Sequence, residues 1–138
     1  MDRIIVETKL ESLRRCLERV RERCPADAAT LATNLDAQDI VSLNLTRAVQ
    51  LCVDLAAHML AASGQPVPDT MGGTFSALAD AEMIPESLAV PLRRAVGFRN
   101  LAVHNYDAID WAIVFAIATR HLSDFEEFAR AVSAHCLR

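Results

Sequence analysis

Apolar residues recur at helical spacing along most of the chain, and short polar or proline-containing stretches separate the helical segments. The first predicted helix ends before Pro25, and its apolar stripe consists of Val6, Leu10, Leu13, Leu17 and Val20. A connector over 25–35 follows. The second helix begins at Asn34 or Asp36, since either side chain is a good N-cap, and it ends at Ser63, directly before a glycine.

Three more helices are predicted after the second one. A short helix covers 70–81, and two adjacent glycines make it the least stable of the set. Pro85 suits the first turn of the next helix, which runs to about Val103. The last helix begins at Asp107 or Asp110 and continues nearly to the C-terminus. Its apolar stripe consists of Trp111, Val114, Ala118, Leu122, Phe125, Ala129 and Val132.

This pattern predicts an all-α fold, an up-and-down bundle of four long helices plus a short one, in a single domain over 1–138. The length of 138 residues is enough to bury a core without metal or disulfide staples. The net charge of −4 argues against broad, non-specific binding to nucleic-acid backbone. An RNA substrate is still compatible with this charge, because a few arginines focused in a cleft can outweigh a mildly acidic surface.

The sequence also indicates a compartment. The first seven residues include charged side chains and no apolar stretch typical of a signal peptide, and no apolar run approaches the roughly 20 residues of a membrane span. We therefore expect a cytoplasmic protein without a membrane partner. The four cysteines form no C-x-x-C pair, and none lies near a histidine at zinc-ligand spacing, so we expect reduced thiols with a structural role.

The second helix carries polar residues in an otherwise apolar sequence. At 100° per residue, Asn44, Arg47, Asp54 and His58 fall within an arc of about 80°. One interpretation is an internal hydrogen-bonded network, and another is half of a metal site at Asp54 and His58, although no further ligands have suitable spacing. We favour a third interpretation, in which the stripe lines a polar groove that a second copy of the chain could share.

The pattern Arg-x4-His occurs twice, at Arg99/His104 and at Arg130/His135. The second copy lies near the end of the last helix, and we interpret it as coincidence. The first copy lies where a helix gives way to a loop, which is where functional residues concentrate. Residues five apart on a regular helix point about 140° apart. Arg99 and His104 can therefore converge only if the helix ends or distorts between them, or if a second chain supplies the other half.

Arginine and histidine together suit the cleavage of RNA without a metal. A neutral histidine can take the proton from the ribose 2′-hydroxyl near neutral pH. The guanidinium of arginine can stabilise the negative charge of the pentacovalent phosphorane. The alternative is structural: Arg99 would bind loop carbonyls, and His104 would cap the C-terminus of its helix.

Residues 97–107, Gly-Phe-Arg-Asn-Leu-Ala-Val-His-Asn-Tyr-Asp, resemble the Arg-x4-His-x-Tyr signature of HepT toxins, a branch of the HEPN superfamily. Segments 43–58 and 121–128 are similar as well, in the right order. The resemblance implies a HEPN-type homodimer with two motifs facing each other across its interface. It also implies a metal-independent endoribonuclease that serves as the toxin of a toxin–antitoxin system. Its partner would be a cognate minimal nucleotidyltransferase antitoxin, which transfers AMP from ATP to the motif tyrosine.

Carried over by residue, the resemblance makes Arg99 and His104 catalytic, gives Asn100 a supporting role and makes Tyr106 the AMP acceptor. It implies no cofactor and no metal. Further supporting residues, expected in the wall of the same groove, are Asn44, Arg47, Asp54 and His58. An alternative function is a non-enzymatic dimeric HEPN adaptor that binds a nucleotidyltransferase or a nucleotide. A plain structural bundle would require both the polar stripe and the motif to be coincidental.

Overall fold

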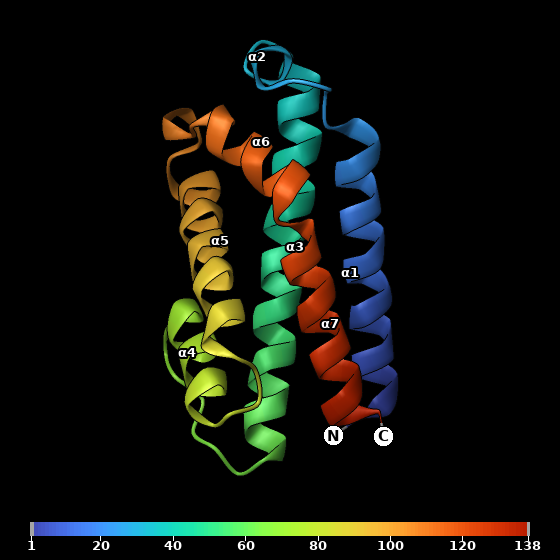
Figure 1. Ribbon diagram of the computed structural model, residues 1–138, viewed down its shortest axis with the longest axis vertical. Helices are drawn as coiled ribbons and strands as arrows, with labels where there is room; N and C mark the ends of the chain where they lie inside the picture. The colour runs from blue at the N-terminus through green and yellow to red at the C-terminus, as the bar shows by residue number, and fades with distance from the viewer. Residues whose placement is uncertain (1, 138) are drawn as a thin grey trace.

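The computed structural model describes residues 2–137, and this part of the chain contains helices and no strands (Figure 1). In chain order the elements are α1 (Arg3–Arg23), α2 (Ala28–Leu31), α3 (Leu35–Ala62), α4 (Met71–Asp80), α5 (Glu86–His104), the 3₁₀ turn η1 (Tyr106–Ala108), α6 (Trp111–Arg120) and α7 (Leu122–Cys136). The predicted all-α class and the helical bundle are therefore confirmed.

Side-chain caps fix the ends of several helices where the sequence predicted them. The Asn34 side chain accepts a hydrogen bond from the Ala37 amide (3.0 Å) at the start of α3, and Gly64 follows α3 with a φ of +71°. The Thr70 hydroxyl accepts from the Gly73 amide (3.1 Å) at the start of α4. Each such cap stabilises its helix by about 1 kcal/mol, so these boundaries need no tertiary contact to be set.

Helix α3 is the centre of the bundle. It packs against α1 and α7 on one side and against α4 and α5 on the other, and both described ends of the chain lie at the same end of the molecule (Figure 1). Buried aliphatic side chains of α3, such as Leu45 and Leu55, form the core together with residues of the neighbouring helices. Phe75 of α4 contacts Phe128 of α7 edge to face, with ring centroids 5.7 Å apart.

The central position of α3 explains its composition. By length and hydropathy alone, α3 could cross a membrane, although only half of its most apolar stretch is buried in this fold. Arg47 and Asp54 interrupt the apolar sequence of this helix, so it does not contradict the expectation that no uninterrupted apolar run approaches the length of a span. Neighbouring helices cover α3 from several directions, and a helix covered in this way must be apolar on most of its sides.

The last predicted helix is two helices. It breaks at His121, which ends α6 and precedes α7, and the imidazole Nδ1 lies 3.0 Å from the Asp124 carboxylate. The break lets α6 pack on α2 at one end of the bundle while α7 packs on α3 and α5 (Figure 1). The predicted stripe stays largely buried on both pieces, because Ala118, Leu122 and Phe125 continue the helical spacing through the break.

The connector over 25–35 contains a helix of one turn that the sequence pattern did not predict. The Asp27 carboxylate caps this helix, α2, through the Thr30 amide (2.8 Å), and Leu31 is fully buried. The buried Gln38 side chain donates to the Leu31 carbonyl (2.9 Å), which ties α2 to the first turn of α3. A connector without apolar periodicity thus gains its structure from one cap and one buried leucine.

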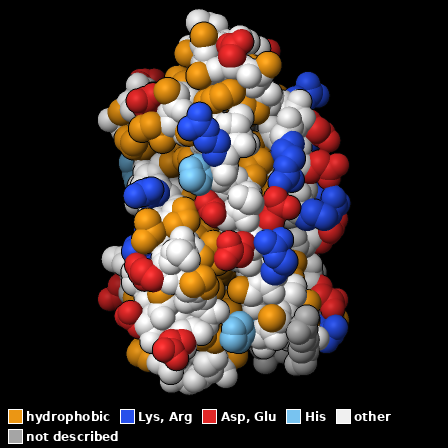
Figure 2. Space-filling model, viewed as in Figure 1, with side chains coloured by type: hydrophobic (Ala, Val, Ile, Leu, Met, Phe, Trp, Pro, Cys, Tyr) orange, Lys and Arg blue, Asp and Glu red, His pale blue; other side chains and the backbone are white. Residues whose placement is uncertain are grey.

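Charge is distributed unevenly over the surface. Basic and acidic side chains alternate along α1, at the right-hand edge of Figure 2, and pairs such as Arg14 with Glu11 (2.8 Å) and Glu18 (2.8 Å) neutralise one another. Hydrophobic side chains gather in the upper left of the same view, over α6 and the neighbouring end of α5. The face formed by α5 and α6 is therefore the more apolar one.

Candidate functional site

The first Arg-x4-His motif lies on the last turns of α5. This helix remains continuous from Glu86 to His104, so the backbone positions of Arg99 and His104 direct their side chains about 140° apart. The helix neither ends nor distorts between the two residues. The backbone of α5 therefore does not bring the two side chains together.

Arg99 is partly buried, and its guanidinium forms a hydrogen bond with the side chain of the next residue, Asn100. Its Nη1 donates to the Asn100 side-chain oxygen (3.2 Å), and no loop carbonyl accepts a hydrogen bond from its side chain within residues 2–137. Arg99 Nε is buried and lacks a hydrogen-bond partner among the described residues. Leaving such a donor unpaired costs free energy that the remaining contacts of the fold must offset. The structural alternative for Arg99 gains no support from these contacts.

His104 is exposed and is the last residue of α5. At 100° per residue, Gly97, Leu101 and His104 fall within about 60° of one another on this helix, and all three are exposed. Asn100 precedes His104 by one turn on the same side. The hydrogen bond from Arg99 to Asn100 thus holds the guanidinium toward the face that carries His104.

Tyr106 begins η1 and reaches back to α3. Its hydroxyl donates to the Asp39 carboxylate (2.7 Å) and lies 3.3 Å from the Ser42 hydroxyl. The ring contacts Trp111 edge to face, with centroids 5.7 Å apart. Partial burial raises the pKa of the Tyr106 phenol, and the negative charge of Asp39 adds to this shift, while the hydrogen bond from Ser42 opposes it.

The sequence did not identify Asp39, Ser42 or Trp111 as residues that contact the motif tyrosine. Asp39 and Ser42 lie three residues apart and share one face of α3, so the sequence could have shown that they are neighbours. It could not show what contacts them, because Tyr106 is 67 residues away from Asp39 along the chain.

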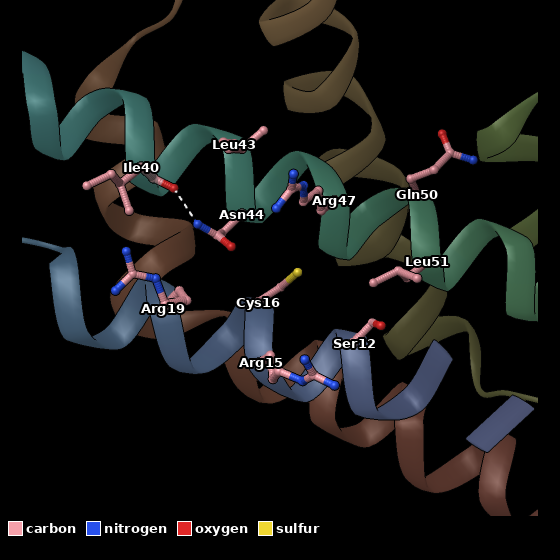
Figure 3. A pocket seen from close by; sticks show the side chains of 10 residues that line it. All are labelled: Ser12, Arg15, Cys16, Arg19, Ile40, Leu43, Asn44, Arg47, Gln50 and Leu51. Atoms are coloured by element: carbon pink, nitrogen blue, oxygen red, sulfur yellow. Dashed lines mark hydrogen bonds between the residues drawn. The ribbon is translucent and has the colours of Figure 1, made fainter. Parts of the chain in front are cut away.

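Asn44 and Arg47 line a groove of about 630 Å³ between α1 and α3 (Figure 3). Its charged lining residues are all arginines: Arg15 and Arg19 from α1, opposite Arg47 from α3. Arg15 and Arg19 are paired with Glu11 (3.5 Å) and Glu22 (3.3 Å), whereas Arg47 has no carboxylate within 4.0 Å among residues 2–137. The buried Asn44 side chain donates to the Ile40 carbonyl (2.8 Å) at the groove wall. Exposed Leu43 adds an apolar surface, so this groove combines positive charge with aliphatic contact area.

The structure separates the other two polar residues of α3 from this groove. Asp54 binds the Lys9 amine (3.2 Å) and the Gln50 amide (3.0 Å), and it lines a different hollow together with His58. The expectation that all four residues line one groove with the motif is therefore wrong for a single chain. Two features of α3 separate these residues. Asp54 lies seven residues after Arg47, about 10 Å further along the helix, and Asn44 lies about 160° around α3 from Ser42, which contacts Tyr106.

Comparison with known proteins agrees with the predicted fold and with the resemblance to HepT toxins. A family model described as ribonuclease HepT-like matches residues 13–132. The chain is 32% identical over 130 residues to the mRNA nuclease HepT of Shewanella oneidensis, which covers 94% of this chain and 97% of the relative. It is 24% identical over 134 residues to the tRNA nuclease HepT of Aphanizomenon flos-aquae, covering 97% and 91% of the two chains.

The fold also matches a solved structure over almost its full length. This structure is the tri-AMPylated HEPN toxin of Shewanella oneidensis in complex with MNT antitoxin, with a TM-score of 0.89 and 31% identity over 97% of this chain and 99% of that chain. The resemblance to HepT toxins is confirmed by these matches. The chain belongs to the ribonuclease HepT-like family.

Proposed function

We propose that this chain is a metal-independent endoribonuclease, the toxin of a toxin–antitoxin system, which acts in the cytoplasm as one domain that pairs with a second copy. The observation that carries the proposal is the Arg99/His104 motif on a continuous helix of a HepT-like fold. One chain holds the two groups apart, and a two-fold pair of chains offers two copies of each group for one composite site.

In the reaction, His104 takes the proton from the ribose 2′-hydroxyl, and the 2′-oxygen attacks the adjacent phosphorus. The bond from phosphorus to the 5′-oxygen then breaks, which leaves a 2′,3′-cyclic phosphate on one product and a 5′-hydroxyl on the other. Arg99 stabilises the negative charge of the phosphorane through the terminal nitrogens of its guanidinium. Asn100 supports this arrangement by holding the Arg99 head group.

Gly97 supports a close pairing of two α5 helices. A glycine inside a helix costs about 0.5–1 kcal/mol relative to alanine. A Cβ at Gly97 would have no heavy atom within 4 Å, so packing inside this chain does not require the glycine. A partner helix that approaches at Gly97 does require it. Such a homodimer covers the exposed Leu101 and brings the two His104 side chains to its interface.

The arginine groove supports a role in holding RNA. Arg47 carries the uncompensated positive charge of this groove, and Arg15 and Arg19, although paired with Glu11 and Glu22, place further guanidinium donors opposite it. Local basic groups of this kind can bind phosphates on a chain of net charge −4. Asn44 and Arg47 thus keep a supporting role, in substrate binding and not in the chemistry. Asp54 and His58 have no contact that connects them to the motif, and their contacts assign them no part in the reaction.

Silencing fits the position of Tyr106, two residues after His104. The Shewanella toxin is tri-AMPylated and binds an MNT antitoxin. For the present chain, a minimal nucleotidyltransferase is the partner, and Tyr106 accepts AMP from ATP. The adduct adds negative charge beside His104, which repels the phosphates of RNA.

The test is cleavage of mixed cellular RNA in excess EDTA. The parent protein should cut RNA, and His104→Ala should be slower by about 10² or more, the usual contribution of a general base. His135→Ala is the matched control, because it alters the second Arg-x4-His copy, and it should cut at the parent rate. Equal cleavage by His104→Ala would contradict the proposal. Cleavage by no form, with an unmodified Tyr106 peptide by mass, would favour the adaptor function.

A further inference from the structure

The hydroxyl of Tyr106 is bound to α3 rather than free in solvent. Its closest partner is the Asp39 carboxylate at 2.7 Å, which is short enough for a strong hydrogen bond in which the phenol donates. Tyr106 is 37% exposed and Asp39 is exposed as well, so this pair of residues lies at the surface of the fold.

A phenol in this setting is a weak nucleophile. Burial raises the pKa of Tyr106, and the charge of Asp39 acts in the same direction. The hydroxyl therefore keeps its proton near neutral pH, and this proton must leave when the oxygen forms a bond to phosphorus. A general base must lie within hydrogen-bond reach of the proton that it removes, at about 2.6–3.2 Å. Within residues 2–137, Asp39 is the carboxylate at this distance.

We propose that Asp39 is a catalytic residue for the modification of Tyr106, an inference that rests on the proposed function of Tyr106 as AMP acceptor. The Tyr106 oxygen attacks the α-phosphorus of ATP held by the nucleotidyltransferase. The oxygen–phosphorus bond forms as the bond to the β-phosphate oxygen breaks, and pyrophosphate leaves. The phenolic proton passes to Asp39. The general base for AMP transfer to Tyr106 thus belongs to the toxin itself and not to the nucleotidyltransferase.

Ser42 completes the arrangement. Its hydroxyl lies 3.3 Å from the Tyr106 oxygen and 3.3 Å from the Asp39 carbonyl, so it can turn its hydrogen toward either acceptor. As the Tyr106 oxygen gains negative charge, a hydrogen bond from Ser42 stabilises it. Asp39 and Ser42 therefore act on the same oxygen from one face of α3, Asp39 as proton acceptor and Ser42 as donor.

The experiment measures AMP transfer to the full-length protein by intact mass, with ATP, Mg²⁺ and the cognate nucleotidyltransferase. Asp39→Asn keeps the shape of the side chain and removes the base. Its transfer rate should fall by about 10² at neutral pH and then rise with pH as hydroxide replaces the carboxylate. Asp36→Asn is the matched control, because Asp36 lies one turn earlier on α3 and has no contact with Tyr106; it should react at the parent rate.

Each outcome decides a separate question. Parent rate and parent pH profile in Asp39→Asn would overturn the role of Asp39. A slower rate with an unchanged pH profile would also overturn it, because Asp39 would then only position the tyrosine. RNA cleavage by Asp39→Asn at the parent rate shows that the variant is folded and that ribonuclease activity does not depend on Asp39. An unmodified parent protein would instead refute the acceptor role of Tyr106 in the proposed function.

Discussion

Gly97→Ala should change the stability of one chain and the association of two chains in opposite directions. The new methyl group meets no heavy atom within 4 Å, so it introduces no clash inside the chain. Alanine in place of a glycine within a helix stabilises the folded state by about 0.5–1 kcal/mol. The isolated chain should therefore unfold at higher urea concentration than the parent.

The same methyl group should oppose close contact between two α5 helices. An extra methyl in a well-packed contact usually costs about 1–3 kcal/mol, and in a two-fold dimer it is present twice. Since about 1.4 kcal/mol corresponds to a factor of ten, dimer dissociation constants should rise at least tenfold. When the protein is diluted, the rate of RNA cleavage should then fall more steeply for Gly97→Ala than for the parent, because the proposed composite site needs both chains.

Sedimentation velocity over a dilution series measures the association, and urea unfolding of the dilute protein measures the stability of one chain. Gly72→Ala is a useful control: its Cβ also has open space, but it lies on α4, away from the motif helix. Unchanged association in Gly97→Ala, together with increased stability, would refute the pairing of α5 helices at this residue. A loss of stability would refute the packing argument itself.

Three further predictions concern other parts of the molecule. Folding raises the pKa of Tyr106 above its ordinary value of 10.0, so protonated Tyr106 stabilises the folded state fully below pH 10.0 and loses this effect as the pH rises through the folded-state pKa. In urea unfolding, Tyr106→Phe should therefore lose less stability at alkaline pH than the parent. Complete burial raises the pKa of Cys52 far above its ordinary value, so thiol reagents should modify the partly buried Cys136 first and Cys52 only on unfolding. Arg47→Gln should weaken RNA binding and lower its salt slope by about 0.7, as expected for one lost phosphate contact to a single strand, while Arg14→Gln should not.

The predicted helices agree with the structure where a local signal sets their ends. Asn34 and Gly64 bound α3, and Thr70 begins α4, because a cap or a positive φ is a property of a few neighbouring residues. The break at His121 carries no glycine or proline. Apolar spacing continues through it, and the break depends on α6 packing against α2, a contact between distant segments that periodicity does not report.

In the candidate site, too, local sequence predicts some features, and contacts between distant segments determine the others. Helical geometry alone predicts that Arg99 and His104 diverge, and the continuous α5 agrees with that prediction. Polar spacing on α3 singles out Asn44 and Arg47, which line one groove, but it groups Asp54 with them. Asp54 lies further along α3, where it binds Lys9 of α1 and lines a different hollow. Pairs that bind across helices are set by tertiary packing, so the sequence pattern could identify the polar residues without identifying their partners.

The contact of Tyr106 with Asp39 shows how the site can combine activity with silencing. Only one residue lies between His104 and Tyr106, and the hydrogen bond to Asp39 holds the Tyr106 hydroxyl against α3. A phosphodiester on the Tyr106 oxygen removes the donated hydrogen and places an anion against a carboxylate, so this contact cannot survive modification. The adduct must therefore leave the Asp39 carboxylate. Because Tyr106 lies two residues after His104, the displaced adduct stays close to the motif, where its negative charge opposes the binding of RNA phosphate.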